Sequence, residues 1–272
     1  MMRNLKTVLE QALRVVEDVG VFIRQEAHQF QQDHIETKAL NSLVTYVDKT
    51  AEKMLVERLN HILPEAGFWT EEETAIREEK TFTWIIDPLD GTTNFIHHVP
   101  VYGISVGLKK EQELLLGIIY EVNRKELFYA QKQSGAFLNH QKIKVSTTRL
   151  LSDALIASGF PYNDHTYLAP YLLSFEHFVR HARGVRRLGS AAVDLAYIAC
   201  GRFDGYFEYG LNPWDVAAGI LLVREAGGVV QDFQGLPDVL SGQQVLASNE
   251  ALSLRLLNIT KQFFYPEFSS NF

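Results

Sequence analysis

Cysteine is almost absent from this chain of 272 residues, which contains only Cys200. A single cysteine excludes an internal disulfide and is typical of a protein that works in a reducing cytoplasm. A phosphatase that uses a cysteine nucleophile would carry an arginine six residues further on, and that position is Tyr206 here. Cysteine-based phosphate chemistry is therefore not expected.

Positive charge is also in short supply. The chain has 26 Lys and Arg against 33 Asp and Glu, which gives a net charge of −7. No basic stripe is visible, so nucleic acid is not expected as an obligatory ligand.

Long apolar runs are missing as well. None approaches the roughly 20 residues that cross a bilayer, and residues 1–10 carry no basic-then-apolar secretion signal. We therefore expect a cytoplasmic protein with no membrane contact.

The chain does contain an acidic motif at residues 84–95, which read Trp-Ile-Ile-Asp-Pro-Leu-Asp-Gly-Thr-Thr-Asn-Phe. An apolar run leads to Asp87 and Asp90, Gly91 then permits close backbone approach, and Thr92 can start a helix. Such a place can hold hard cations on the carboxylates and a phosphate on helix N-terminal amides. The alternative is a strand that ends in an ordinary polar turn.

Two further segments bring acids next to apolar residues. Residues 71–73 are three glutamates directly after Phe68-Trp69-Thr70, and Asp215 follows Asn-Pro-Trp and opens an apolar stretch of small residues. Each has a plain alternative, a solvated turn for the glutamates and a helix N-cap for Asp215. The three segments together favour one shared site.

Acids gathered in one cleft imply cations. Glu71, Asp87, Asp90 and Asp215 would repel one another without them, and two or three divalent ions would make the cleft attractive to phosphate. The three motifs contain no Lys or Arg and no Cys or His cluster. Oxygen-only ligands select Mg²⁺, or Mn²⁺ as an alternative, over Zn²⁺.

The motif Asp-Pro-Leu-Asp-Gly-Thr-Thr-Asn-Phe with the later Trp-Asp-Val-Ala-Ala-Gly resembles the inositol monophosphatase family of magnesium-dependent, lithium-sensitive phosphomonoesterases. The resemblance extends from the N-terminal helical region to about residue 250. Two positions depart from the family pattern. Thr70 stands where a Gly usually precedes the glutamate pair, and residues 41–48 keep only the last acid, Asp48.

The resemblance implies a role for each matching residue. Glu71, Asp87, Asp90 and Asp215 are expected as metal ligands, with Leu89 through its carbonyl. Glu71 and the Thr92–Asp48 pair are expected to orient and deprotonate a metal-activated water. Substrate contacts are expected from phosphate-binding and alcohol-binding positions, namely Asp90, Gly91, Thr92, Gly189, Ala191, Glu208 and Asp215. For Glu208 the alternative is an exposed acid at a strand end.

Other patterns in the chain carry less weight. Residues 103–107 match Gly-x-Ser-x-Gly, but the alternation that follows indicates a strand, and a serine nucleophile needs a helix there. His97-His98 is expected to be a solvated helix end. The three arginines in residues 183–187 could hold phosphate or form a loop, and the resemblance puts them near the substrate or a dimer contact. Two residues separate Asp87 from Asp90, so an aspartyl-phosphate intermediate is not favoured.

Apolar periodicity and turn residues predict the elements. Helices are expected over residues 4–30, 48–63, 92–97, 167–180, 190–200 and 215–226, and strands over 84–86, 155–158 and 203–208. Residues 102–145 are expected to form a meander of antiparallel strands, for example over 104–108, 114–120 and 127–129. The resemblance turns this into alternating α-β-α-β-α layers with mixed and antiparallel sheets. We expect a single domain over residues 1–265, made of two fused lobes at about 1–150 and 151–265, and a disordered tail at 266–272.

The expected reaction is hydrolysis of myo-inositol monophosphate by a homodimeric enzyme. A broader sugar-phosphate phosphatase, similar to fructose-1,6-bisphosphatase, stays open. Some bacterial relatives act as binding partners of the transcription machinery, and this class stays open too.

Overall fold

The computed structural model describes residues 4–30, 35–39, 42–78, 80–161, 165–241 and 243–266. Of the tail predicted at 266–272, all but Pro266 lies outside these residues. No helix in the described part of the chain is long and apolar enough to span a membrane.

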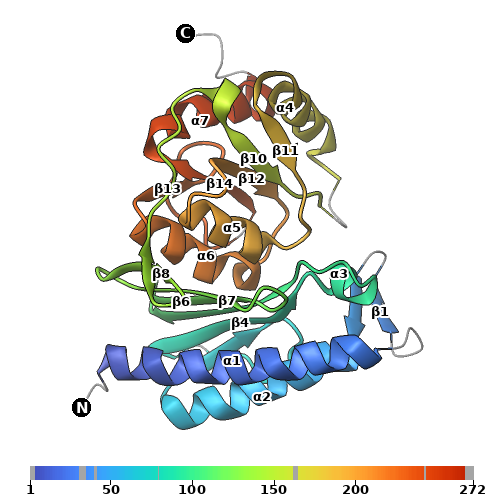
Figure 1. Cartoon of the computed structure of the whole chain (residues 1–272), viewed down its shortest axis with the longest axis vertical. Coiled ribbons are helices and arrows are strands. Elements are labelled where there is room, and N and C mark those ends of the chain that lie inside the picture. The colour runs from blue at the N-terminus through green and yellow to red at the C-terminus, as the bar shows by residue number, and fades with distance from the viewer. Residues whose placement is uncertain are drawn as a thin grey trace.

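Two helices form the first layer, α1 (Leu5–Gln29) and α2 (Tyr46–Ile62). In α1 the apolar residues recur at helical spacing, and those from Val8 to Ile23 face the core. The start of α2 is fixed by a capping box, in which Thr45 and Asp48 each bond to the other's backbone or side chain. Both helices pack on one face of a seven-stranded sheet (Figure 1).

This sheet follows chain order from β3 to β9. β3 runs parallel to β4, and every later neighbour pair is antiparallel. Its strands are β3 (Gly67–Thr70), β4 (Phe82–Asp90), β5 (Gly103–Lys110), β6 (Glu113–Glu121), β7 (Glu126–Gln131), β8 (Gly135–Leu138) and β9 (Gln141–Ile143).

The middle layer consists of α5 (Ala191–Ala199) and α6 (Pro213–Glu225). Every residue of α5 is buried, because the helix lies between the two sheets and contacts both (Figure 1). Small residues such as Ala217 and Ala218 let α6 pack closely on the first sheet. A helix that is apolar all round needs this enclosed position.

The second sheet has the order β11-β10-β12-β14-β13. Its strands are β10 (Leu155–Ser158), β11 (Gly184–Arg186), β12 (Gly205–Tyr209), β13 (Gly228–Gln231) and β14 (Gln244–Asn249). Side chains alternate along β12, so Tyr206 joins the core around α5 while Phe207 joins the core under the outer helices. Those outer helices are α4 (Leu168–His181) and α7 (Glu250–Phe264).

Four smaller elements complete the described structure. Strands β1 (Ile35–Ala39) and β2 (Ser42–Thr45) form an antiparallel pair. The short helix α3 (Thr92–Ile96) follows β4 directly, and a single 3₁₀ turn at Leu151–Asp153 precedes β10.

The layered α-β-α-β-α fold is confirmed (Figure 1). One predicted strand was too short, because 84–86 is the middle of β4, which runs on through both aspartates. Helix α7 and the strands β3, β11, β13 and β14 were not predicted, nor was the pair β1 and β2. The division into two lobes stays a prediction.

Candidate active site

Asp87 and Asp90 lie in the last part of β4, and a bulge sets their direction. Asp87 pairs with Ser105 and Asp90 with Gly103 of β5, so three steps along β4 match two along β5. In a regular strand, side chains three residues apart point to opposite faces. The extra residue changes the phase of the alternation, and both aspartates line one cavity.

Gly91 turns the chain from β4 into α3. Its φ of 100° is in the left-handed region, which favours glycine. A Cβ at this position would lie 3.1 Å from the Val101 carbonyl oxygen and 3.3 Å from that of Gly189. The backbone of Gly91 and Thr92 can therefore line the cavity without a side chain in the way.

The predicted Thr92–Asp48 pair is present. The Thr92 hydroxyl donates to Oδ1 of Asp48 at 2.8 Å and also lies 3.1 Å from the Leu89 carbonyl oxygen. Asp48 is buried, and Oδ2 accepts bonds from the Thr45 amide and hydroxyl. Burial raises the pKa of Asp48, and the bonds from Thr45 and Thr92 oppose that rise.

Glu71 begins the loop after β3, and α2 holds this loop. The buried Glu52 carboxylate accepts from the Glu72 amide at 2.7 Å and from the Thr74 amide and hydroxyl at 2.8 and 2.7 Å. Thr70, where the sequence departs from the family pattern, continues the pairing of β3 opposite Ile86 of β4. The Thr70 hydroxyl is buried without a hydrogen-bond partner in the described structure.

Asp215 is the third residue of α6, and the helix N-cap is Asn212. The suggestion that Asp215 is itself an N-cap is therefore wrong, because Pro213 already occupies the first helical position. The backbone N–H of Asn212 donates to Oδ2 of Asp215 at 2.7 Å, which fixes the carboxylate at the helix start. Trp214 meets Trp69 edge to face, which joins this corner to the strand that leads into Glu71.

All these segments meet at one cavity of about 360 Å³. Every predicted ligand and substrate-contact residue lines it, and Asp48 is reached through its bond to Thr92. The predicted residues that line it are Glu71, Asp87, Leu89, Asp90, Gly91, Thr92, Gly189, Ala191, Glu208 and Asp215.

Burial and mutual repulsion raise the pKa values of the acids in this cavity. Burial first, and then the charges of Glu71, Asp90 and Asp215, raise the pKa of Asp87 well above its usual value. Burial, with the charge of Asp90 next, raises the pKa of Asp215 to about 8. Burial raises the pKa of Asp90 to about 6, against the lowering effect of its bonds to Ser190 and Ala192. The cavity therefore needs protons or cations to balance its charge.

A divalent cation fits this cavity by charge and donor type. The donors are carboxylates and the Leu89 carbonyl, which are the ligands that Mg²⁺ accepts. Within the described residues, however, no three His, Cys, Asp or Glu side chains stand at coordinating geometry as they are. Oδ1 of Asp87 accepts from the Leu89 amide at 2.9 Å.

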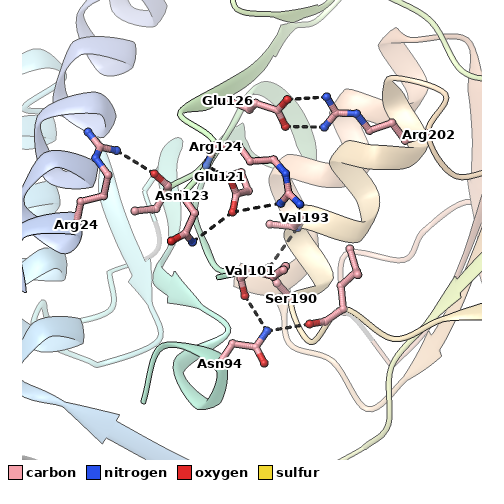
Figure 2. A network of polar contacts seen from close by, with 12 residues as sticks. Arg24, Asn94, Val101, Glu121, Asn123, Arg124, Glu126, Ser190, Val193 and Arg202 are labelled. Atoms are coloured by element: carbon pink, nitrogen blue, oxygen red, sulfur yellow. Dashed lines mark hydrogen bonds and ion pairs between the residues drawn. The ribbon is translucent and has the colours of Figure 1, made fainter. Parts of the chain in front are cut away.

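Asp90 also ties the first sheet to the middle layer. Its Oδ2 accepts from the Ser190 hydroxyl at 2.7 Å and the Ala192 amide at 2.6 Å. Beside it, Nδ2 of Asn94 donates to the carbonyls of Val101 and Leu188 at 2.7 and 2.8 Å (Figure 2). These bonds hold the start of α5, with Gly189 and Ala191, against the end of β4.

A second polar network braces the same junction farther from the cavity. Arg24 of α1 donates to the Val122 carbonyl, and the buried Glu121 accepts from the Arg124 amide (Figure 2). Arg202, just beyond the end of α5, donates from both terminal nitrogens to the Glu126 carboxylate, at 2.5 and 2.6 Å. Bidentate pairs of this kind fix orientation as well as contact.

Glu208 lines the cavity from β12 and is buried, so the suggestion of an exposed strand-end acid is wrong. The Tyr206 hydroxyl donates to its Oε2 at 2.6 Å. A Cβ on Gly159 would lie 2.1 Å from both Glu208 carboxylate oxygens, so only glycine leaves room for this orientation. Burial raises the pKa of Glu208 to about 7, and Tyr206 and then Arg187 oppose the rise.

Among the three arginines of residues 183–187, only Arg187 lines the cavity. Arg183 pairs with Asp153 on the surface, and Arg186 donates to the Val185 carbonyl. Arg187 lowers the pKa of Asp90 and of Glu208 through its charge.

Two of the weaker patterns are resolved as expected. Ser105 lies within β5, is fully buried, and donates to the Trp214 carbonyl at 2.9 Å, so it is no nucleophile. His97 and His98 are exposed at the end of α3.

The sequence prediction missed several residues of the site. Glu52, Ser190 and Asp194 are buried polar groups, and their types carry no signal that separates them from ordinary helix residues. Asn94 was quoted within the motif but given no role. Gly159 is also invisible to pattern analysis, because its importance depends on Glu208, which lies 49 residues away.

The chain is similar to known proteins over nearly its whole length. The model of the inositol monophosphatase family matches residues 4–262. An inositol-1-monophosphatase from Synechocystis is 40% identical over 96% of this chain and 92% of its own length. The Nus factor SuhB of Pseudomonas aeruginosa is 37% identical over 96% and 98%. The solved inositol monophosphatase of Anabaena superposes with a TM-score of 0.85 at 34% identity, covering 96% of this chain and 98% of that one.

Proposed function

The chain belongs to the inositol monophosphatase family and is a phosphatase, and on this premise we propose that it hydrolyses myo-inositol monophosphate to inositol and phosphate with Mg²⁺. The observation that carries the proposal is the cavity itself. Four acids, the Thr92–Asp48 pair and Glu208 come from separate elements and meet around one space.

Two or three Mg²⁺ ions, held by Glu71, Asp87, Asp90, Asp215 and the Leu89 carbonyl, would supply positive charge for the phosphate and lower the pKa of water. The support is the donor set and the raised pKa values of the aspartates. Mn²⁺ is the alternative ion, because it accepts the same oxygen ligands.

The Thr92–Asp48 pair is proposed to accept the proton of the attacking water. The Thr92 hydroxyl donates to Asp48, so its lone pairs stay available for a water proton while its own proton can pass to Oδ1. Glu71 is proposed to orient that water from the opposite loop. The amides of Gly91 and Thr92 are proposed to receive phosphate oxygens.

The alcohol is proposed to leave toward α5 and β12. Gly189 and Ala191 border this side of the cavity, and Glu208 can accept a bond from a ring hydroxyl. Asp90 and Asp215 are proposed to contact the substrate as well as the metal, since both line the same cavity as Gly189, Ala191 and Glu208.

A substrate panel tests the proposal. Steady-state kcat/KM would be measured with Mg²⁺ for myo-inositol 1-phosphate, fructose 1,6-bisphosphate and p-nitrophenyl phosphate, and each assay repeated in excess chelator. We expect the inositol ester to have the highest value and chelation to abolish all three activities. Turnover that survives chelation would overturn the metal requirement, and a preference for the fructose ester would favour the broader sugar-phosphate phosphatase.

A second candidate function rests on the name of a relative. The Pseudomonas protein described above is called a Nus factor, which supports a role for this chain as a binding partner of the transcription machinery. A pull-down with purified RNA polymerase and Nus proteins, with and without Mg²⁺, would test it. Specific retention by a turnover-deficient variant would show that binding is separate from catalysis.

A further inference from the structure

Asp194 is a buried acid in the first turn of α5 that the roles above do not use. Its side chain is only 1% exposed, and Oδ1 has no hydrogen-bond partner among the described residues. An unpartnered carboxylate oxygen in the protein interior is costly, because it gives up water without receiving another donor. Such a group is rare unless something outside the chain supplies the donor.

Asp194 also lines the catalytic cavity, beside Glu208 and Arg187. Burial and the charge of Glu208 raise the pKa of Asp194 well above its usual value, and Arg187 acts in the opposite direction. The two carboxyl groups therefore share the side of the cavity from which the alcohol is proposed to leave. The phosphate group is not expected on this side, because the negative charge of these carboxyl groups would repel it.

A polyhydroxylated alcohol provides hydroxyl groups that can form hydrogen bonds with the carboxyl groups of Asp194 and Glu208. Glu208 is held in place by the Tyr206 hydroxyl and occupies the space that a side chain at Gly159 would fill, so it presents a fixed acceptor. Hydroxyl groups donate to carboxylate oxygens and accept from carboxylic acids, so they suit Asp194 in either protonation state.

We propose that Asp194 is a second specificity-determining residue, which binds a hydroxyl group of the substrate alcohol next to the one bound by Glu208. The preferred substrate is then a phosphate ester whose alcohol offers at least two hydroxyls on the side facing α5 and β12. This inference rests on the proposed phosphatase function.

The test compares two esters with the same ring, myo-inositol 1-phosphate and cyclohexyl phosphate, which has no hydroxyls. Asp194→Ala should lower kcat/KM for the inositol ester by about tenfold or more, as the loss of a hydrogen bond to a charged group predicts, and change the cyclohexyl ester by less than about twofold. Asp194→Asn, which keeps one acceptor oxygen, should give an intermediate loss. Glu208→Gln should show the same substrate pattern.

Thermal unfolding separates this role from a structural one. Neither Asp194 variant should lower Tm, because no partner is lost. The matched control is Asp204→Ala at another buried aspartate, whose Oδ2 accepts from the Leu155 amide at 2.7 Å, a bond that alanine cannot make. This control should lower Tm and leave the ratio of the two kcat/KM values unchanged.

Three outcomes would overturn the inference. Asp194→Ala could leave both esters unchanged, lower both equally, or lower Tm together with both activities. If the wild-type protein with Mg²⁺ hydrolyses neither ester nor any other phosphomonoester, the proposed function fails and the inference fails with it. That outcome is recognised in the wild type, before any variant is examined.

Discussion

Asp48 and Glu52 lie one turn apart on α2, and each fixes a different wall of the catalytic cavity. Oδ1 of Asp48 lies 2.8 Å from the Thr92 hydroxyl after β4, and Oε2 of Glu52 lies 2.7 Å from the Glu72 amide after β3. The separation of four residues puts both carboxylates on one helix face. The position of one helix therefore sets the distance between the Glu71 loop and the Thr92 corner.

Glu52→Gln should weaken the response to Mg²⁺. One of the two acceptor oxygens becomes an NH₂ group that faces a backbone N–H, which should cost about 1–3 kcal/mol of stability and loosen the Glu71 loop. The measurements are Tm and the Mg²⁺ concentration for half-maximal activity. Glu57→Gln, at an exposed position of the same helix, is the control and should change neither.

Asp215→Asn should reduce turnover by more than about tenfold, because it removes an anionic ligand and keeps the shape. Folding should survive, since the amide oxygen can still accept from the Asn212 amide. Turnover and circular dichroism would be measured at saturating Mg²⁺. Full activity under those conditions would restrict Asp215 to its bond at the helix start.

Metal-free protein should lose stability as the pH rises from about 4 to about 8. The folded pKa values of Asp90 and Asp215, about 6 and about 8, lie above the ordinary value near 3.9. The folded state then holds more protons than the unfolded state in this range, so each step up in pH favours unfolding. Thermal unfolding in chelator should show Tm falling by several degrees, with a smaller slope in Asp215→Asn.

Added Mg²⁺ should flatten that pH dependence, because a ligand that binds only the folded state stabilises it and replaces the missing protons. A Tm that rises with pH in chelator would show that the aspartates do not carry the raised pKa values.

Lithium should inhibit the enzyme at millimolar concentrations by competing for a magnesium position after the chemical step. The family resemblance is the basis, and Thr70 is the residue that tests it. Inhibition would be measured for the wild type and for Thr70→Gly, which restores the usual family residue before the glutamates. A flat Li⁺ titration in both proteins would count against the role of the Glu71 loop.

The chain should form a homodimer in solution. Light scattering at micromolar concentration should give twice the chain mass of 30.9 kDa. Exposed apolar residues on α4, including Leu172, Leu173 and Val179, are one surface whose substitution by serine would then be informative. A measured mass equal to that of one chain would show that this expectation is wrong.

The sequence allowed the prediction that the three acidic segments share one site, because each segment is a short local motif, and all three line one cavity. It could not predict the bulge between Asp87 and Asp90, since a bulge exists only relative to the pairing of β4 with β5. It also could not separate Glu52 or Asp194 from solvated helix acids, because their burial depends on segments far along the chain. Helix α7 is a different case, because its buried apolar residues do recur at helical spacing and are a signal that the sequence carries.

Because of the bulge in β4, the directions of the Asp87 and Asp90 side chains depend on the pairing of β4 with β5 as well as on the spacing of the motif. The bulge exists only where three steps along β4 meet two steps along β5. Beside a partner strand that takes three steps over the same stretch, the carboxylates of Asp87 and Asp90 would point to opposite faces of the sheet. A protein engineer who moves this motif to another scaffold must therefore transplant the partner strand as well, because the geometry is encoded by two segments and cannot be carried by one.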